Sequence, residues 1–142
     1  MNDLCFASAT DLARLIATRE VSSTEVTRVY LDRIQQHDAH LRTFITVDAE
    51  RALAAAQAAD EAGGPKGPLH GVPIGVKDNI ATRDLRTTGG SRVLAEWVPD
   101  HGVDGPAHLL GRSKQQRTFT CVVRFSLRAS ELRILRCAQD DM

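Results

Sequence analysis

The segment that most restricts the fold is GVPIGVKDN, residues 71–79. Its β-branched residues alternate with Pro73 and Gly75, which disfavour a helix and are tolerated at the start or the edge of a strand. The pattern predicts a strand over residues 72–76 whose backbone lies close to another element. Lys77 ends the run, in a chain that has three lysines and fifteen arginines. The question is whether this cation performs chemistry or pairs with the neighbouring Asp78.

Two amphipathic helices are expected before this strand. The first has Thr10 or Asp11 as its cap and ends near Arg19. Its apolar face is spaced at i, i+3 and i+4 and consists of Leu12, Leu15 and Ile16. The second begins at the capping box formed by Ser22 and Glu25 and runs to about residue 37. Its apolar face consists of Val26, Val29, Tyr30 and Ile34.

A short strand and a third helix complete the pattern. The stretch FITV, residues 44–47, is aromatic and β-branched, which is typical of a strand. Asp48 then caps an alanine-rich helix that reaches about Ala62, and the sequence Gly-Gly-Pro stops it. The order helix, helix, strand, helix, strand indicates an α/β fold.

Composition limits the classes of function. Apolar residues make up 42% of the 142 residues and charged residues 25%, as in an ordinary globular domain. Eighteen basic residues balance eighteen acidic ones, so direct binding to nucleic acid is not expected. No apolar run approaches the roughly 20 residues of a membrane helix, and no signal peptide is recognisable, so we expect a cytoplasmic protein without a membrane partner.

No metal or cofactor site is expected. Three cysteines without a C-x-x-C spacing favour plain thiols over a disulfide or a zinc site. His37 and His40 lie three residues apart, but no carboxylate or cysteine cluster accompanies them, so solvated histidines are the preferred interpretation.

The last part of the chain differs from the rest. Residues 1–112 hold 12 basic and 15 acidic residues, whereas residues 113–142 hold 6 basic and 3 acidic. The apolar residues there are a cluster at 121–123 and a weak helical series at Leu127, Leu132 and Leu135. We therefore expect two parts, an α/β portion over 1–100 and a poorly structured, unrelated tail over 101–142; a basic docking helix is the alternative.

The residues from Gly67 to Ser91, GPLHGVPIGVKDNIATRDLRTTGGS, resemble the lysine-bearing segment of the amidase signature family. The upstream stretch SSTEVTRVYLDRI is similar to a helix of the same family. Members include acylamide amidohydrolases and the A subunit of the glutamyl-tRNA(Gln) amidotransferase. The likeness runs from about Leu4 to Asp100 and implies the N-terminal part of an α/β/α domain with a mixed central sheet.

The resemblance implies a Ser–cis-Ser–Lys triad, in which one serine attacks an amide carbonyl, a second relays the proton and a lysine accepts it. Lys77 matches that lysine, and Asp78 and Asn79 would orient its loop. A free lysine titrates near ~10.4, so the family's chemistry needs a site that disfavours the ammonium. The implied substrate is a small carboxamide, or glutamine as an ammonia donor, and no metal or organic cofactor is implied.

Both serines of the family lie downstream of the lysine, in segments that this sequence does not match. Ser91 follows Thr87-Thr88 and aligns with an early family turn, so it is not expected to be the nucleophile. We therefore expect a truncated hydrolase that is inactive alone, with a frameshift as the simplest cause, and that can self-associate. The alternative is a non-catalytic interaction module that complements a separately encoded remainder.

Overall fold

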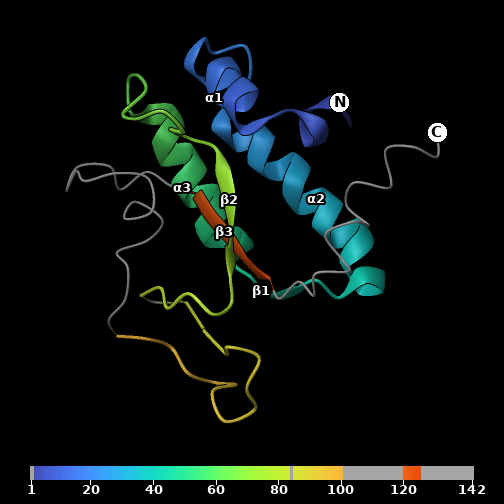
Figure 1. Ribbon diagram of the computed structural model, residues 1–142. Coiled ribbons are helices and arrows are strands. Elements are labelled where there is room, and N and C mark those ends of the chain that lie inside the picture. The colour runs from blue at the N-terminus through green and yellow to red at the C-terminus, as the bar shows by residue number, and fades with distance from the viewer. Residues whose placement is uncertain (1, 84, 101–119, 126–142) are drawn as a thin grey trace.

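The computed structural model describes residues 2–83, 85–100 and 120–125 (Figure 1). Its elements are a short 3-10 helix η1 (Asn2–Phe6), helices α1 (Ala9–Ala17), α2 (Ser23–Leu41) and α3 (Ala49–Glu61), and strands β1 (Phe44–Val47), β2 (Pro73–Lys77) and β3 (Thr120–Phe125). The predicted order of helices and strands through residue 77 is therefore confirmed.

The helix ends follow from side chains that satisfy the free backbone groups. Ser8, not Thr10 or Asp11, caps α1, because its side chain accepts a hydrogen bond from the backbone N–H of Asp11. The predicted capping box of Ser22 and Glu25 starts α2. That helix continues past the predicted end at residue 37 to Leu41 and stops where the backbone turns left-handed.

Strand β1 follows α2 through a turn that is fixed by one carboxylate. Asp38 Oδ1 accepts hydrogen bonds from the backbone N–H groups of Thr43 and Phe44, at 2.8 and 3.1 Å, and from the Thr43 hydroxyl at 2.9 Å. Asp48 then caps α3, as the sequence predicted. The strand FITV is thus tied at both ends to the helices that flank it.

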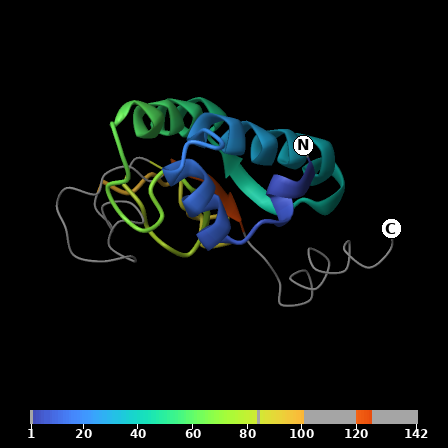
Figure 2. The same cartoon turned by 90° about the horizontal axis from the view of Figure 1, so that it is seen from above.

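The three strands form one sheet in the order β1-β3-β2. Strand β3 runs antiparallel to β1 and parallel to β2, and Lys77 pairs with Phe125. Figure 2 shows α2 and α3 together on one side of the strands. The sequence predicted no strand in residues 101–142, so β3 corrects that expectation for six of them; the rest, including the weak helical series at Leu127, Leu132 and Leu135, lie outside the described residues.

The core of the described chain consists of two small apolar clusters. The larger joins α1, α2 and the residue just before β2 through Leu12, Ile16, Val26 and Val72. The smaller centres on Ala52, with Leu31, Ile34 and Phe44 packed around it. Alanines at the buried positions of α3 let that helix lie close to α2. The larger cluster fixes the end of β2 opposite to Lys77.

Candidate active site

The strand that carries Lys77 is anchored where it begins. Gly71 has a φ of +77°, and a Cβ there would lie 3.0 Å from Ser23 Cβ. The buried Ser23 hydroxyl donates a hydrogen bond to the Gly71 carbonyl, and His70 Nε2 donates one to the carbonyl of Ala59 at 3.0 Å. The predicted close approach of this backbone to another element is thus the contact with the N-terminus of α2.

That N-terminus is itself held by α3. Asp60 Oδ1 accepts a hydrogen bond from the Ser23 N–H at 2.7 Å, and its Oδ2 accepts from the N–H and the hydroxyl of Thr24 at 3.0 and 2.7 Å. A carboxylate at a helix N-terminus also interacts favourably with the helix dipole. Asp60, Ser23 and Gly71 therefore form a continuous chain of contacts from α3 to β2.

Lys77 ends β2 and points away from the packed side of the strand. Val76 is buried, whereas Gly75 and Lys77 are exposed, as alternation along a strand requires. Strands β2 and β3 are parallel and end together, because Lys77 pairs with Phe125. The carboxyl edge of parallel strands is the usual place for a ligand in α/β folds. The described part of the chain leaves the Lys77 side chain exposed and does not enclose it.

Asp78 holds the chain that follows the lysine. It is 2% exposed, and its carboxylate accepts hydrogen bonds from the N–H of Thr88 at 2.9 Å, from the Thr88 hydroxyl, and from the N–H of Gly90 at 3.1 Å. The Gly89 N–H also donates to the Asp78 carbonyl at 3.2 Å. The T-T-G-G turn is therefore folded onto the residue next to Lys77, while Asn79 is exposed.

The Ser91 side chain faces its own turn. Its Oγ accepts a hydrogen bond from the Val93 N–H at 3.2 Å, and its N–H donates to the Thr88 carbonyl at 2.9 Å. Both contacts are those of a turn residue. Among the described residues, this geometry brings no base to the hydroxyl that would activate it as a nucleophile.

Arg86 is a site-supporting residue that the sequence did not reveal. Its guanidinium donates hydrogen bonds to the Ile45 carbonyl at 3.0 Å and to the Thr46 hydroxyl at 3.3 Å. Ile45 falls at the register shift between Phe44 and Thr46, so the arginine reaches the irregular part of β1. This contact holds the loop after Asp78 against the sheet. Because it joins residues far apart in the sequence, no local sequence pattern predicts it.

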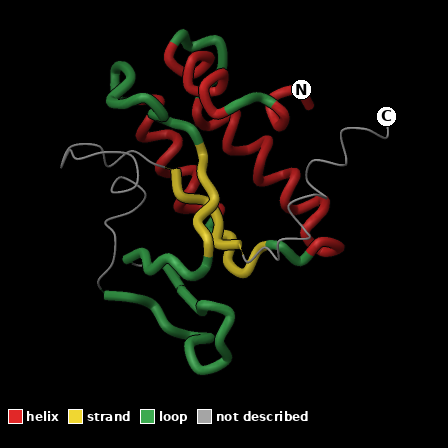
Figure 3. Tube along the Cα trace, in the orientation of Figure 1, coloured by secondary structure: helices red, strands yellow, loops and turns green. Residues whose placement is uncertain are grey.

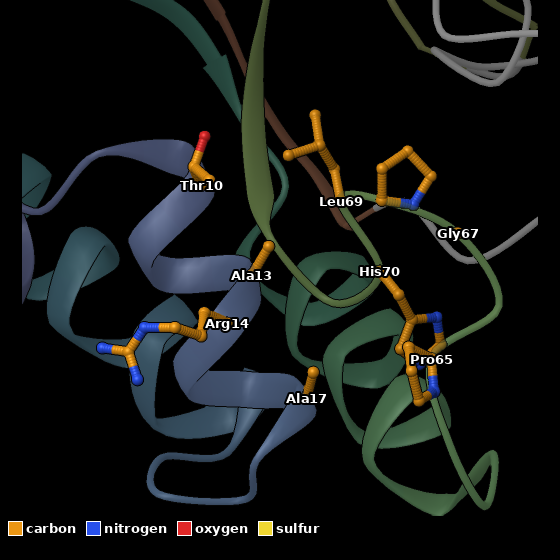
Figure 4. A pocket seen from close by; sticks show the side chains of 9 residues that line it. Thr10, Ala13, Arg14, Ala17, Pro65, Gly67, Leu69 and His70 are labelled. Carbon is orange, nitrogen blue, oxygen red and sulfur yellow. The ribbon is translucent and has the colours of Figure 1, made fainter.

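A separate cavity of about 390 Å³ lies at the other end of β2 (Figure 4). It is formed by α1 and the loop before β2, and its lining includes Thr10, Ala13, Ala17, Pro65, Leu69 and His70. The Arg14 guanidinium points away from it in Figure 4 and pairs with Glu20 at 3.2 Å. Among the described residues that line the cavity, no charged groups converge on it, and it lies apart from the lysine site.

Within the described residues, no group of three or more His, Cys, Asp or Glu side chains could hold a metal ion. His37 and His40 are both exposed near the end of α2. None of the helices in this part of the chain is both long and apolar enough to span a bilayer.

Comparison with known proteins agrees with the sequence patterns. The model of the Amidase family matches residues 25–106. The chain is 49% identical over 104 residues to the A subunit of the glutamyl-tRNA(Gln) amidotransferase of Salinispora arenicola (strain CNS-205), an alignment that covers 71% of this chain and 21% of that protein. The corresponding A subunit of Azoarcus sp. (strain BH72) is 44% identical over 110 residues, covering 76% and 22%. The chain thus spans about a fifth of the length of these curated relatives.

Solved structures give the same picture. The fold is similar to fatty acid amide hydrolase with a TM-score of 0.73 and 27% identity, over 89% of this chain and 22% of that one. It is similar to the native peptide amidase from Stenotrophomonas maltophilia with a TM-score of 0.65 and 31% identity, over 84% and 24%. The α/β arrangement around β2 is therefore part of a larger known architecture.

Proposed function

Because this chain belongs to the amidase family, we propose that it supplies the lysine-bearing segment of an amidohydrolase, with Lys77 as the proton acceptor. The observation that carries the proposal is the position of Lys77 inside the matched segment, exposed at the carboxyl edge of two parallel strands. Strand β2 is anchored where it begins, and Asp78 binds the turn at residues 88–90. The backbone on both sides of the Lys77 amine is therefore held in place.

In the proposed reaction, a serine Oγ adds to the carbonyl carbon of a carboxamide. Its proton passes through a second serine to the neutral amine of Lys77 and then to the leaving nitrogen, as the C–N bond breaks. Water releases the acid from the acyl-serine in the second half. Both serines come from polypeptide that this sequence does not match, so the chain alone has a base without a nucleophile.

The substrate class follows from the C–N bond that breaks in this reaction. We propose a small carboxamide, or glutamine as an ammonia donor for tRNA amidation if the parent protein is an amidotransferase component. Its partners would then be the other components of that amidotransferase. The reaction as written moves protons between serine and lysine and needs no metal or organic cofactor.

Asp78 has a positioning role in this proposal. Its buried carboxylate bonds the turn at residues 88–90, which fixes the backbone on the carboxyl side of Lys77. Asn79 is exposed beside it and orients the same loop. The support is the number and geometry of the hydrogen bonds to Asp78, which tie two segments ten residues apart.

A second candidate is a non-catalytic module that pairs with a separately made remainder of an amidase domain. The sheet order β1-β3-β2 favours it, because among the described strands β1 and β2 each pair on one side only. An open edge offers backbone N–H and C=O groups to another strand. Self-association of this chain would use the same groups.

A graft tests the role of Lys77. The 104 aligned residues of the Salinispora arenicola relative are replaced by those of this chain, and ammonia release from glutamine is measured in the assembled amidotransferase. We expect Lys77→Ala to lower kcat at least about 100-fold, the range of a general base, and Lys77→Arg to do the same. The control Lys66→Ala, another exposed lysine, should leave the rate unchanged. An active, folded graft whose Lys77→Ala variant keeps full activity would refute the proposal.

A further inference from the structure

The register of the sheet places the start of β1 level with the lysine. Phe44 of β1 and Lys77 of β2 both pair with the same residue of the central strand, Phe125. In the next row, Thr46 and Val76 again share one partner on β3. The start of β1 and the end of β2 therefore lie in the same rows of the sheet, with only β3 between them.

Arg86 binds β1 in these rows. Its Nη2 donates a hydrogen bond to the Ile45 carbonyl at 3.0 Å, and its Nε and Nη2 both donate to the Thr46 hydroxyl at 3.3 Å. The register between β1 and β3 skips Ile45, and a skipped residue is left out of the regular ladder. A guanidinium suits two such acceptors, because its donors are held in one plane on separate nitrogens.

The chain leads from Arg86 directly to the donors that bind Asp78. Thr87 is buried, and its N–H donates a hydrogen bond to the Trp97 carbonyl at 2.9 Å. Thr88 then donates its N–H and its hydroxyl to the Asp78 carboxylate. Figure 3 shows this loop extending from the end of β2, away from α1. A single buried and bonded residue thus separates the arginine from the turn that holds Asp78.

Together these contacts form a closed circuit that includes the lysine. The circuit runs from β1 through Arg86 to the turn at residues 88–90, then to Asp78 and Lys77, and back to β1 across β3. Closing a chain of contacts removes conformations that an open chain could adopt. Without the arginine, the turn and Asp78 would remain bonded to each other but would lose this attachment to β1.

We propose that Arg86 is a positioning residue for the proton transfer at Lys77. It acts through Asp78, by holding against β1 the turn that binds this carboxylate. The inference rests on the proposed function, because it names a further residue on which the base of that reaction depends. A misplacement of about 1 Å can cost on the order of 100-fold in rate, so loss of Arg86 should lower kcat rather than raise KM.

The first test uses the full-length chain and needs no activity. The chain has three lysines, so ¹⁵N-lysine labelling gives three backbone amide signals. We expect Arg86→Ala to shift the Lys77 signal and to raise its hydrogen-exchange rate at least about tenfold, while the Lys66 signal stays in place. The control Arg92→Ala removes an exposed arginine from the same loop and should leave the Lys77 signal unchanged.

The second test measures ammonia release from glutamine in the graft that carries the aligned residues of this chain. Arg86→Ala should lower kcat per folded molecule at least about tenfold and leave KM within about twofold. Arg86→Lys keeps the charge but not the planar fork, so it should restore only part of the rate. Thr46→Val removes one acceptor, so adding it to Arg86→Ala should cost nothing more.

A destabilised control separates position from stability. Ala54→Gly weakens α3 at an exposed helix position through helix propensity alone, so it should keep the wild-type kcat per folded molecule and the wild-type Lys77 signal. Equal losses in Ala54→Gly and Arg86→Ala would show that the arginine acts only on stability, which would overturn the inference.

Two other results would also overturn it. They are an unmoved Lys77 signal in folded Arg86→Ala, and full kcat of that variant in a graft that Lys77→Ala inactivates. If Arg86→Ala does not fold, Arg86→Lys replaces it in both tests, and the same results count against the inference. A graft in which Lys77→Ala itself keeps full activity would instead refute the proposed function.

Discussion

At the scale of single residues, Asp78 links the candidate base to the loop that follows it. Three donors on Thr88 and Gly90 converge on a carboxylate that is 2% exposed. Buried polar groups that lose a partner keep the cost of desolvation. The residue beside the lysine is therefore the one whose removal should disturb this loop most.

We expect Asp78→Ala to lower the free energy of unfolding by about 2–4 kcal/mol, because two backbone N–H groups and a hydroxyl lose their acceptor together. Urea denaturation followed by circular dichroism measures the change. Asp32 is exposed on α2, so Asp32→Ala serves as the control and should change the stability by less than about 0.5 kcal/mol. Equal effects of the two variants would contradict the role given to Asp78.

Gly71 provides a second test at this scale, because its backbone is left-handed and its surroundings are full. Ser23 and the Ile16 side chain would lie within 3.2 Å of an added Cβ. Gly63 has a similar φ of +73° but no atom within 4 Å of such a Cβ. Gly71→Ala should therefore cost about 1–3 kcal/mol more than Gly63→Ala, which carries the backbone strain alone. Equal melting temperatures of the two variants would show that the contact with α2 does not constrain β2.

Local patterns reveal some of these residues and not others. Lys77 and Asp78 lie in a motif that can be read directly from the sequence, and the two residues of the capping box, Ser22 and Glu25, are only three positions apart. Arg86 acts on Ile45 and Thr46, about 40 positions away, and such a pairing exists only after the chain has folded. The exposure of Lys77 also depends on the fold, because strand alternation alone does not say which face is covered.

At the scale of the elements, the start of α2 is fixed by two separate sets of contacts. Its N-terminus combines the capping box with the carboxylate of Asp60 from α3. Periodicity and caps predicted all three helices, with errors of a few residues at the start of α1, where Ser8 is the cap, and at the end of α2, which continues to Leu41. Strand β3 was missed, because a short apolar cluster in a polar stretch becomes a strand only when partners stand on both sides, here β1 and β2.

The capping box makes part of the stability depend on pH. Hydrogen bonds, first from the Ser22 backbone N–H and then from its side chain, hold the pKa of Glu25 below its usual 4.5. A lowered carboxyl pKa stabilises the fold above the unfolded-state pKa, and this contribution is lost as the pH falls through the folded-state value. We therefore expect Glu25→Gln to flatten the dependence of stability on pH below about pH 5. Urea titrations between neutral and acidic pH measure it, and parallel curves for the two proteins would refute this contribution.

At the scale of the whole molecule, the described chain is one part of an α/β amidase fold with two small apolar clusters and a three-stranded sheet. Among the described strands, β1 and β2 pair on one side only, and the side chains of Val93 and Val98 are exposed. Domains of this size keep a net stability of only about 5–15 kcal/mol when they are complete. These features favour marginal stability and association.

We accordingly expect the thermal transition to be broad, or to shift with protein concentration. Differential scanning calorimetry together with sedimentation across concentrations measures both. The physical cause is the exposed apolar side chains together with the outer edges of β1 and β2, which have no partner among the described strands, because each gains partners in an oligomer. A monomer with one sharp, concentration-independent transition above about 60 °C would show instead that the chain is an independent domain.

The central claim is that this chain supplies Lys77 as the base but no serine nucleophile. The activity of the purified 142-residue chain on glutamine and simple carboxamides tests it most directly. On the proposed function, ammonia release should not exceed the buffer background, because the described residues bring no activated serine to Lys77. The Ser91 hydroxyl is engaged in its own turn, so Ser91→Ala should leave this baseline unchanged. Ammonia release well above background that Ser91→Ala abolishes would contradict the central claim and make Ser91 the nucleophile.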